Sequence, residues 1–249
     1  MEQVPSPVWA CVRDARRIVV LSGAGMSAES GVPTFRDGSR GLWSRYDPAT
    51  LATPEAFARD PALVFGWYAW RYTQLQQVEP NAGHRALARW ADGAEVTIAT
   101  QNVDDLHERA GSAVLAHLHG SLAEFRCFAC ERPYRGQIPV ASERTGPIEP
   151  PRCGCGGMIR PGVVWFGEQL PAGALERAAT ACRNADVVLV VGTSGMVYPA
   201  AGLPAVARDA GVRVVEINPH PTPLSADATA TWRATAATAL PALVDAYLT

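Results

Sequence analysis

Short apolar runs recur along the chain, separated by longer segments in which apolar residues return at helical spacing. Four of these runs are rich in β-branched side chains and cover residues 17–22, 95–100, 186–191 and 212–217. Each run is nearly continuous in hydrophobicity, which is typical of strands covered on both faces of a parallel sheet. The pattern therefore predicts at least four buried parallel strands.

Helical signals lie between the predicted strands. Asp60 and Pro61 form an N-cap and first-turn pair, which predicts a long helix that ends near Val78. The alanine-rich segment 170–183 predicts a second helix, and Pro199 begins a third. Strands that alternate with helices indicate an α/β fold with a doubly wound parallel sheet.

The segment 122–160 interrupts this alternation, because it has little periodicity and many Pro, Gly, Arg and Cys residues. We expect residues 1–121 and 161–249 to form the main domain and 122–160 to form a small inserted module. Two cysteine pairs lie in the module, 22 residues apart: Cys127 and Cys130 as C-x-x-C, and Cys153 and Cys155 as the shorter C-x-C.

Four thiolates from two close pairs suit a closed tetrahedral zinc site, and the metal would replace the core that so short an insert lacks. The C-x-C spacing leaves open whether both cysteines of the second pair bind zinc. A disulfide is the poorer interpretation because the sequence shows no export signal, and a redox switch is an alternative.

Composition narrows the class of partner. The 249 residues carry 22 basic and 24 acidic side chains, a net charge of −2, which disfavours a protein that binds mainly nucleic-acid backbone. No apolar run approaches the roughly 18–20 residues of a membrane helix. We therefore expect a cytoplasmic monomer that binds neither nucleic acid nor membranes.

The first predicted strand leads into a glycine-rich loop, which begins with Gly23, Ala24 and Gly25 and ends at Ala28. It matches the G-x-G-x-x-G/A pattern, in which backbone and a following helix N-terminus approach a pyrophosphate. The plain alternative is a tight turn between a strand and a helix. The ribose-binding acid of an ordinary dehydrogenase is missing, and 31–43 is instead a polar, glycine-rich loop suited to closing over a ligand.

A second polar cluster, 100–107, directly follows the second predicted strand. There Asn102 and Asp104 are placed to bind an amide or sugar hydroxyls, although Asp104 or Asp105 would also suit a helix N-cap. His117 and His119 follow soon after, and a histidine near its usual pKa can remove a proton from a hydroxyl. The residues alone do not say which histidine does so.

Six segments occur in the order found in one enzyme family: GAGMSAESGVPTFRDGSRGLW, TQNVDDLHERAG, HLHGS, RPGVVWFGE, GTSGMVYPAAGLP and EINP. From about Arg17 to Val244 the chain resembles the sirtuins, the NAD-dependent protein lysine deacylases. The resemblance implies a Rossmann-like domain with a zinc-binding insert, NAD⁺ as co-substrate and one structural Zn²⁺.

The resemblance also assigns residues. It makes His119 the catalytic base, lets His107 support the pocket, and pairs the backbone of Val164, Trp165 and Phe166 with a substrate peptide. It implies NAD⁺ contacts from Gly23, Ala24, Gly25, Ala28, Phe35, Arg36, Trp43, Gln101, Asn102, Val103, Asp104, Gly192, Thr193, Ser194, Asn218, Pro219, His220 and Ala236.

The implied reaction transfers the acyl group to the ribose of NAD⁺. The acyl-lysine oxygen attacks C1′ of the nicotinamide ribose and expels nicotinamide. His119 then deprotonates a ribose hydroxyl, which attacks the resulting imidate carbon. With one water consumed, the products are free lysine, nicotinamide and O-acyl-ADP-ribose.

The acyl group is suggested by Tyr68 and Arg71, which share a face of the first predicted helix. A phenol beside a guanidinium makes a carboxylate receptor, whereas the alternative is an aromatic core face with a snorkelling arginine. The pair resembles the Tyr-x-x-Arg signature of sirtuins that remove succinyl and malonyl groups. We also expect Gly162 to widen the peptide or acyl channel.

Other activities stay open at this point. The alternatives are a protein that is mainly a deacetylase, a protein ADP-ribosyltransferase that uses the same bound NAD⁺, and a zinc-ribbon interaction module without catalysis. The polar clusters at 100–107 and 117–121 argue against the last of these, because a binding module needs neither.

Overall fold

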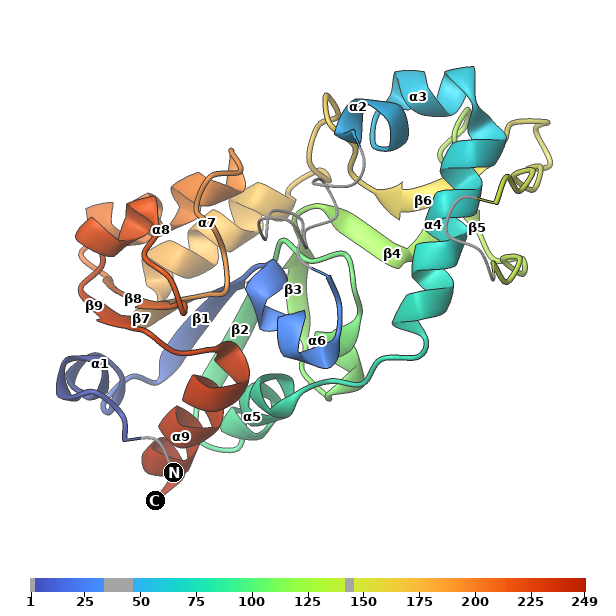
Figure 1. Ribbon diagram of the computed structural model, residues 1–249. Coiled ribbons are helices and arrows are strands. Elements are labelled where there is room, and N and C mark those ends of the chain that lie inside the picture. Colours follow the sequence, from blue (N-terminus) through green and yellow to red (C-terminus); the bar gives the residue numbers. More distant parts are fainter. Residues whose placement is uncertain (1–2, 34–46, 142–145) are drawn as a thin grey trace.

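The computed structural model describes residues 3–33, 47–141 and 146–249. A large sheet covered by helices lies beside a smaller part that contains a second sheet and helices α2, α3 and α4 (Figure 1). The large sheet has six parallel strands in the order β3-β2-β1-β7-β8-β9. The predicted α/β fold with a doubly wound parallel sheet is therefore confirmed.

The four predicted strands all belong to this sheet, and two shorter strands complete it at its edges. The third and fourth begin one residue later than predicted, and the edge strands were not predicted. The strands are β1 (Arg17–Ser22), β2 (Glu95–Thr100), β3 (Val114–His117), β7 (Val187–Val191), β8 (Arg213–Ile217) and β9 (Ala230–Trp232).

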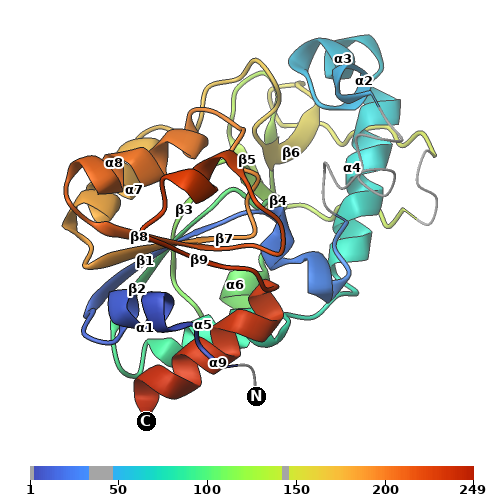
Figure 2. The ribbon, with the colours of Figure 1, turned by 60° about the vertical axis from the view of Figure 1, so that its left-hand side comes forward.

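Helices cover both faces of the large sheet, which explains why its strands are apolar throughout. In β1, Ile18 and Val20 belong to one hydrophobic cluster, whereas Val19 and Leu21 belong to another on the opposite face. Figure 2 shows the two helical layers. The first layer contains α1 (Ser6–Val12), α5 (Ala82–Trp90) and α9 (Ala236–Leu248), and the second contains α7 (Ala174–Asn184) and α8 (Leu203–Asp209).

The smaller part has its own core, built from two separate stretches of the chain. Its antiparallel sheet has the order β5-β4-β6, and its apolar cluster joins Phe65 and Trp67 to Leu122 and Phe125. The elements are α2 (Pro48–Leu51), α3 (Pro54–Arg59), α4 (Pro61–Leu75), β4 (Gly120–Cys127), β5 (Pro133–Tyr134) and β6 (Ile159–Val163). Three helices that precede the segment 122–160 thus share its core.

The long predicted helix is α4, and it begins as expected. The carboxylate of Asp60 accepts a hydrogen bond from the Leu63 N–H at 3.0 Å, which satisfies a free donor of the first turn. The helix ends at Leu75, three residues before the predicted end. The helix expected from Pro199 starts as a 3-10 turn, η4 (Ala200–Gly202), that leads into α8.

The remaining turns are short, namely α6 (Leu106–Arg109) and the 3-10 turns η1 (Ala24–Met26), η2 (Ala28–Ser30) and η5 (Pro223–Ala226). Within the described ranges, every helix is too short or too polar to cross a membrane.

Candidate active site

A cavity of about 1300 Å³ lies where the carboxyl ends of the parallel strands face the smaller part. β1 and β7 are neighbours at the centre of the sheet, and the chain proceeds outward from them in opposite directions. Such a switch point is where open α/β sheets bind ligands. The loops that follow four strands line the cavity, with Gly23–Gly25 after β1, Gln101–Val103 after β2, Gly192–Ser194 after β7 and Asn218–His220 after β8.

The glycine-rich loop is held against the loop after β7. The Gly25 N–H donates to the carbonyl oxygen of Gly192 at 2.8 Å. A Cβ on Gly25 would lie 2.8 Å from the Gly192 Cα, and Gly192 has a positive φ of 61°. These glycines therefore allow contact between two backbones. The helix expected after the loop is not an α-helix. Two short 3-10 turns, η1 and η2, follow the loop instead.

Gln101 and Asn102 enter the cavity from the loop after β2 and are fixed by neighbouring loops. The Gln101 side-chain amide donates to the Thr193 hydroxyl at 3.2 Å, and the Asn102 amide donates to the Ser27 hydroxyl at 3.1 Å. Both side chains line the cavity, together with Val103. Amides held in this way are oriented to recognise a polar ligand.

Asp104 lies behind these residues and is not among the described residues that line the cavity. Its carboxylate accepts from the Leu106 N–H at 3.3 Å, so it acts much like a cap for α6. Burial raises the pKa of Asp104, although hydrogen bonds from Ser27 and Leu106 oppose this change. Its predicted contact with NAD⁺ stays a prediction.

His119 lines the cavity, and its ring is oriented by the backbone. Its Nδ1 lies 3.1 Å from the carbonyl oxygen of Gln101. A carbonyl oxygen can only accept, so Nδ1 carries the proton and Nε2 is the basic nitrogen. Burial lowers the pKa of His119, which keeps the imidazole neutral near pH 7.

His117 has a different environment. Its Nδ1 faces the carbonyl oxygen of Asn102 at 3.2 Å and its Nε2 faces the Glu108 carboxylate at 2.6 Å. Burial alone would lower the pKa of His117, but the bonds to Glu108 and Asn102 outweigh it and raise the pKa. Both ring nitrogens face acceptors, so His117 is poorly suited to act as a base, and the described cavity lining does not include it.

His107 is buried beneath the site, outside the described lining, and its Nε2 lies 2.9 Å from the Ser22 hydroxyl. The Ser22 hydroxyl donates its one hydrogen to the Thr100 hydroxyl at 2.8 Å, so it accepts from His107 Nε2. The Thr100 hydroxyl also accepts from the Asn102 N–H at 3.0 Å. Burial lowers the pKa of His107 to about 3. A supporting role for His107, as the sequence suggested, agrees with these contacts.

Tyr68 and Arg71 lie side by side on α4, and both line the cavity. The Arg71 guanidinium lies 4.9 Å from the Trp67 ring centre, and the Tyr68 hydroxyl accepts from the Trp165 indole N–H at 3.0 Å. Burial raises the pKa of Tyr68 to about 12 and lowers that of Arg71. The pair is thus both part of an aromatic core and open to the cavity.

The segment Val164, Trp165 and Phe166 also lines the cavity, but its N–H groups are already bonded. The Val164 N–H donates to His119, and the Phe166 N–H donates to Ala52, at 2.8 and 2.9 Å. The Trp165 N–H donates to the Glu168 carboxylate at 2.8 Å. A peptide strand pairing with these three residues would therefore have to use their carbonyl groups.

The opposite end of the cavity is formed by the loops after β7 and β8. The Asn218 amide donates to the Thr193 carbonyl oxygen at 2.9 Å, and the Asn218 side-chain oxygen accepts from the His220 N–H. Ser194, Pro219 and Ala236 line this end, as does Ala28 near the glycine-rich loop. The structure thus brings these predicted contacts together around one cavity.

Three predicted contacts lie outside the described residues, and two residues of the cavity had no predicted role. Phe35, Arg36 and Trp43 lie between residues 33 and 47, outside the described residues, so their contacts stay predictions. Met196 and Tyr198 line the cavity with exposed apolar side chains, although no role was assigned to them from the sequence. Their signal was the change from the small residues GTSG to the larger side chains of Met196, Val197 and Tyr198.

The expectation that Gly162 widens the peptide or acyl channel is wrong. A Cβ at this position would lie 3.0 Å from the Glu124 backbone oxygen and 3.1 Å from that of Ser121. Gly162 therefore faces the paired strand β4, and the described lining of the cavity does not include it. The register of β6 on β4 could not be read from the sequence.

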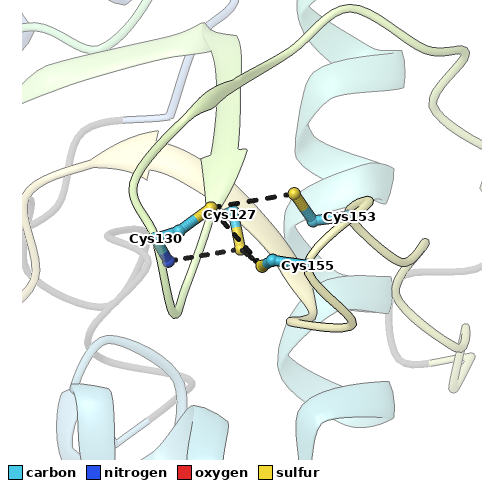
Figure 3. Close-up of side chains that lie close together, drawn as sticks. All are labelled: Cys127, Cys130, Cys153 and Cys155. Atoms are coloured by element: carbon cyan, nitrogen blue, oxygen red, sulfur yellow. Dashed lines mark hydrogen bonds between the residues drawn. The ribbon is translucent and has the colours of Figure 1, made fainter.

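The four cysteines of the small module form one cluster (Figure 3). Their sulfur atoms all lie within 4.8 Å of one another, with 3.5 Å between Cys127 and Cys155 and 3.8 Å between Cys130 and Cys153. These distances exclude disulfides, which need about 2.05 Å. A tetrahedral zinc thiolate site has sulfur separations of about 3.8 Å, so the cluster fits a structural zinc that includes both Cys153 and Cys155.

No cysteine belongs to the described lining of the cavity. Zinc at the cluster would therefore join the turn after β4 to the loop before β6 and take no part in the chemistry of the cavity.

Comparisons with known proteins agree with this geometry. A family model described as Sir2 family matches residues 23–199. An NAD-dependent protein deacylase of Mycolicibacterium paratuberculosis is 58% identical over 228 residues, which is 92% of this chain and 96% of that protein.

Two solved structures extend the comparison. A Sir2 homologue in complex with NAD is 43% identical, with a TM-score of 0.87 and coverage of 100% of this chain and 96% of that one. Sir2Tm bound to a propionylated peptide is 29% identical, with a TM-score of 0.77 and coverage of 95% of each chain. The chain therefore belongs to the Sir2 family of NAD-dependent protein deacylases.

Proposed function

We propose that this NAD-dependent deacylase removes succinyl and malonyl groups from protein lysines, in addition to acetyl groups. The observation that carries the proposal is the placement of Tyr68 and Arg71 together in the wall of the cavity that holds His119. A guanidinium binds a carboxylate through two parallel N–H donors, and a phenol adds a third donor. An acetyl group offers no carboxylate to this receptor.

Burial strengthens the proposed recognition. Tyr68 is 3% and Arg71 8% exposed, so a carboxylate beside them would interact through a medium of lower dielectric than water. The raised pKa of Tyr68 keeps its hydroxyl protonated across the physiological range, and the hydroxyl can therefore donate to a carboxylate. A hydrogen bond to a charged group contributes about 1.5–3 kcal/mol.

The catalytic residues fit an acyl transfer to the ribose of NAD⁺. NAD⁺ supplies an anomeric carbon with nicotinamide as its leaving group, and the cavity holds the glycine-rich loop, Gln101, Asn102 and Asn218 around the volume it would fill. His119 is placed to accept the proton of a ribose hydroxyl at Nε2, because Nδ1 is occupied by the Gln101 carbonyl oxygen.

A competition assay tests the proposal. Succinyl, malonyl and acetyl forms of one lysine peptide are mixed with the enzyme, with and without NAD⁺, and followed by mass spectrometry. The chain itself contains no lysine, so every ε-amine signal comes from the peptide.

We expect NAD⁺-dependent loss of the succinyl and malonyl groups, formation of the matching O-acyl-ADP-ribose, and no turnover of any peptide by His119→Ala. Removal of acetyl alone would contradict the proposal. Transfer of ADP-ribose to protein without deacylation would favour the ADP-ribosyltransferase alternative.

A further inference from the structure

We propose that Trp165 is a positioning residue for acyl specificity, because its indole N–H orients the Tyr68 hydroxyl toward an acidic acyl group. The proposal rests on the proposed function. The resemblance to known enzymes involves only the backbone of Trp165, whereas this role depends on its side chain. The Trp165 Nε1 lies 3.0 Å from the Tyr68 Oη, 97 residues away in the chain.

The direction of this hydrogen bond is fixed by chemistry. An indole N–H can only donate, so the Tyr68 oxygen must accept, and the hydroxyl hydrogen remains available to another acceptor. The described residues provide no acceptor for that hydrogen, and Tyr68 lines the cavity. The hydroxyl therefore presents a donor to whatever occupies this part of the cavity.

Trp165 is itself tightly held. The Arg160 guanidinium lies 3.4 Å from the Trp165 ring centre, and the Phe57 ring lies 5.4 Å away. The Glu168 carboxylate accepts from both the Arg160 guanidinium and the backbone N–H of Trp165. Trp165 is 2% exposed, so its indole has little freedom to turn away from Tyr68.

The consequence differs between acyl groups. Without the indole, the Tyr68 oxygen no longer accepts a hydrogen bond, and the O–H group is free to rotate away from the cavity. The hydrogen bond from this O–H to an acyl carboxylate then becomes weaker. An acetyl group has no carboxylate, so the orientation of the hydroxyl matters much less to its binding. Trp165 should therefore influence the ratio of desuccinylation to deacetylation more than the overall rate.

The test is a double-mutant cycle on the ratio of kcat/KM for a succinyl peptide to kcat/KM for the matching acetyl peptide. The variants are Trp165→Phe, Tyr68→Phe and the double variant. A further protein carries a benzothiophene in place of the Trp165 indole, so that sulfur replaces the N–H while the shape is kept. Trp90→Phe is the matched control, because Trp90 is fully buried in the other core and its indole N–H has no partner within the described residues.

We expect Trp165→Phe and the benzothiophene variant each to lower the ratio about tenfold, mainly through a higher KM for the succinyl peptide. In the Tyr68→Phe background, Trp165→Phe should lower the ratio no further. The Trp90→Phe ratio should match that of the unchanged enzyme.

Three outcomes would overturn the role of Trp165. These are an unchanged ratio in the benzothiophene variant, equal losses on both peptides, and an undiminished effect of Trp165→Phe when Tyr68 is already phenylalanine. The proposed function is judged separately by Arg71→Met. If Arg71→Met lowers the ratio and the Trp165 variants do not, the carboxylate receptor stands and the role of Trp165 is contradicted.

Discussion

The Nδ1 atom of His119 lies 3.1 Å from the carbonyl oxygen of Gln101, and this contact leaves Nε2 as the basic nitrogen in the cavity. This hydrogen bond does not require a positively charged ring, because a neutral imidazole already carries one N–H to donate. The same loop that supplies the carbonyl also supplies the Gln101 and Asn102 side chains, so the base and these amides are fixed by a single segment.

The first prediction concerns the pH dependence of catalysis. Burial lowers the pKa of His119 below its usual value of about 6.5, and the neutral imidazole is the active form. We expect kcat/KM to fall on the acid side with a pKa below 6.5 and to stay level from there to neutral pH. A pH profile with a free-enzyme pKa above 7 would show that this histidine is not the base, or that its environment is charged differently.

The second prediction concerns stability in acid. His84 and His107 pack ring to ring at 4.9 Å, and burial lowers their pKa values to about 4 and about 3. Below about pH 6.5 the unfolded chain binds protons at these positions that the folded chain does not, so stability falls as the pH falls from 6.5 toward 4. Each histidine contributes a slope of about 1.4 kcal/mol per pH unit in that range.

Urea unfolding at several pH values measures this slope. His84→Gln should reduce the pH dependence between pH 6 and pH 4.5 relative to the unchanged protein. Equal slopes in the His84→Gln variant and the unchanged protein would contradict the assignment.

The third prediction concerns the buried ion pair of Arg160 and Glu168, whose side chains are 3% and 19% exposed. Removal of one partner strands a buried charge, so Glu168→Ala should lower the free energy of unfolding by about 3 kcal/mol. The double variant Arg160→Met with Glu168→Ala should lose less than Glu168→Ala alone. Chemical denaturation measures both values, and Asp245→Ala at the exposed pair with Arg89 should change stability by less than about 1 kcal/mol. A double variant that loses as much stability as Glu168→Ala, or more, would contradict the account of a stranded buried charge.

The fourth prediction concerns the zinc site. Cys153→Ser and Cys155→Ser should each lower the zinc content and the Tm, because both thiols belong to the cluster with Cys127 and Cys130. Metal analysis and thermal unfolding test this, with Cys182→Ala, a buried thiol in the other part of the molecule, as the control. Full zinc content in either serine variant would exclude that cysteine as a ligand.

The sequence predicted those parts of the fold that depend on local pattern. Residues 17–22 and 95–100 matched their strands because a central parallel strand is apolar on both faces, whereas β9 has three residues and too short a run to detect. Tyr68 and Arg71 were paired correctly by helical spacing. The place of helices α2, α3 and α4 in the second core was not predictable, because their apolar side chains share a cluster with residues of β4 and β6 that lie far away in the sequence.

The same limit applies to the site. The residues alone could not distinguish His117 from His119, since both lie in one short polar segment, and the difference arises from the acceptors that each ring meets. The bond from Trp165 to Tyr68 and the contact of Gly162 with β4 depend on how the segment after β4 returns to the sheet. Neither contact can be predicted from the local composition of the sequence.

The preference for acidic acyl groups is the central proposal, and Arg71 tests it most directly. The measurement is the ratio of kcat/KM for a succinyl-lysine peptide to kcat/KM for the matching acetyl-lysine peptide, in the unchanged enzyme and in Arg71→Met. Loss of the guanidinium removes a charge-assisted pair with the acyl carboxylate, so the ratio should fall at least about tenfold while deacetylation persists. An unchanged ratio would contradict the assignment of Tyr68 and Arg71 as a carboxylate receptor.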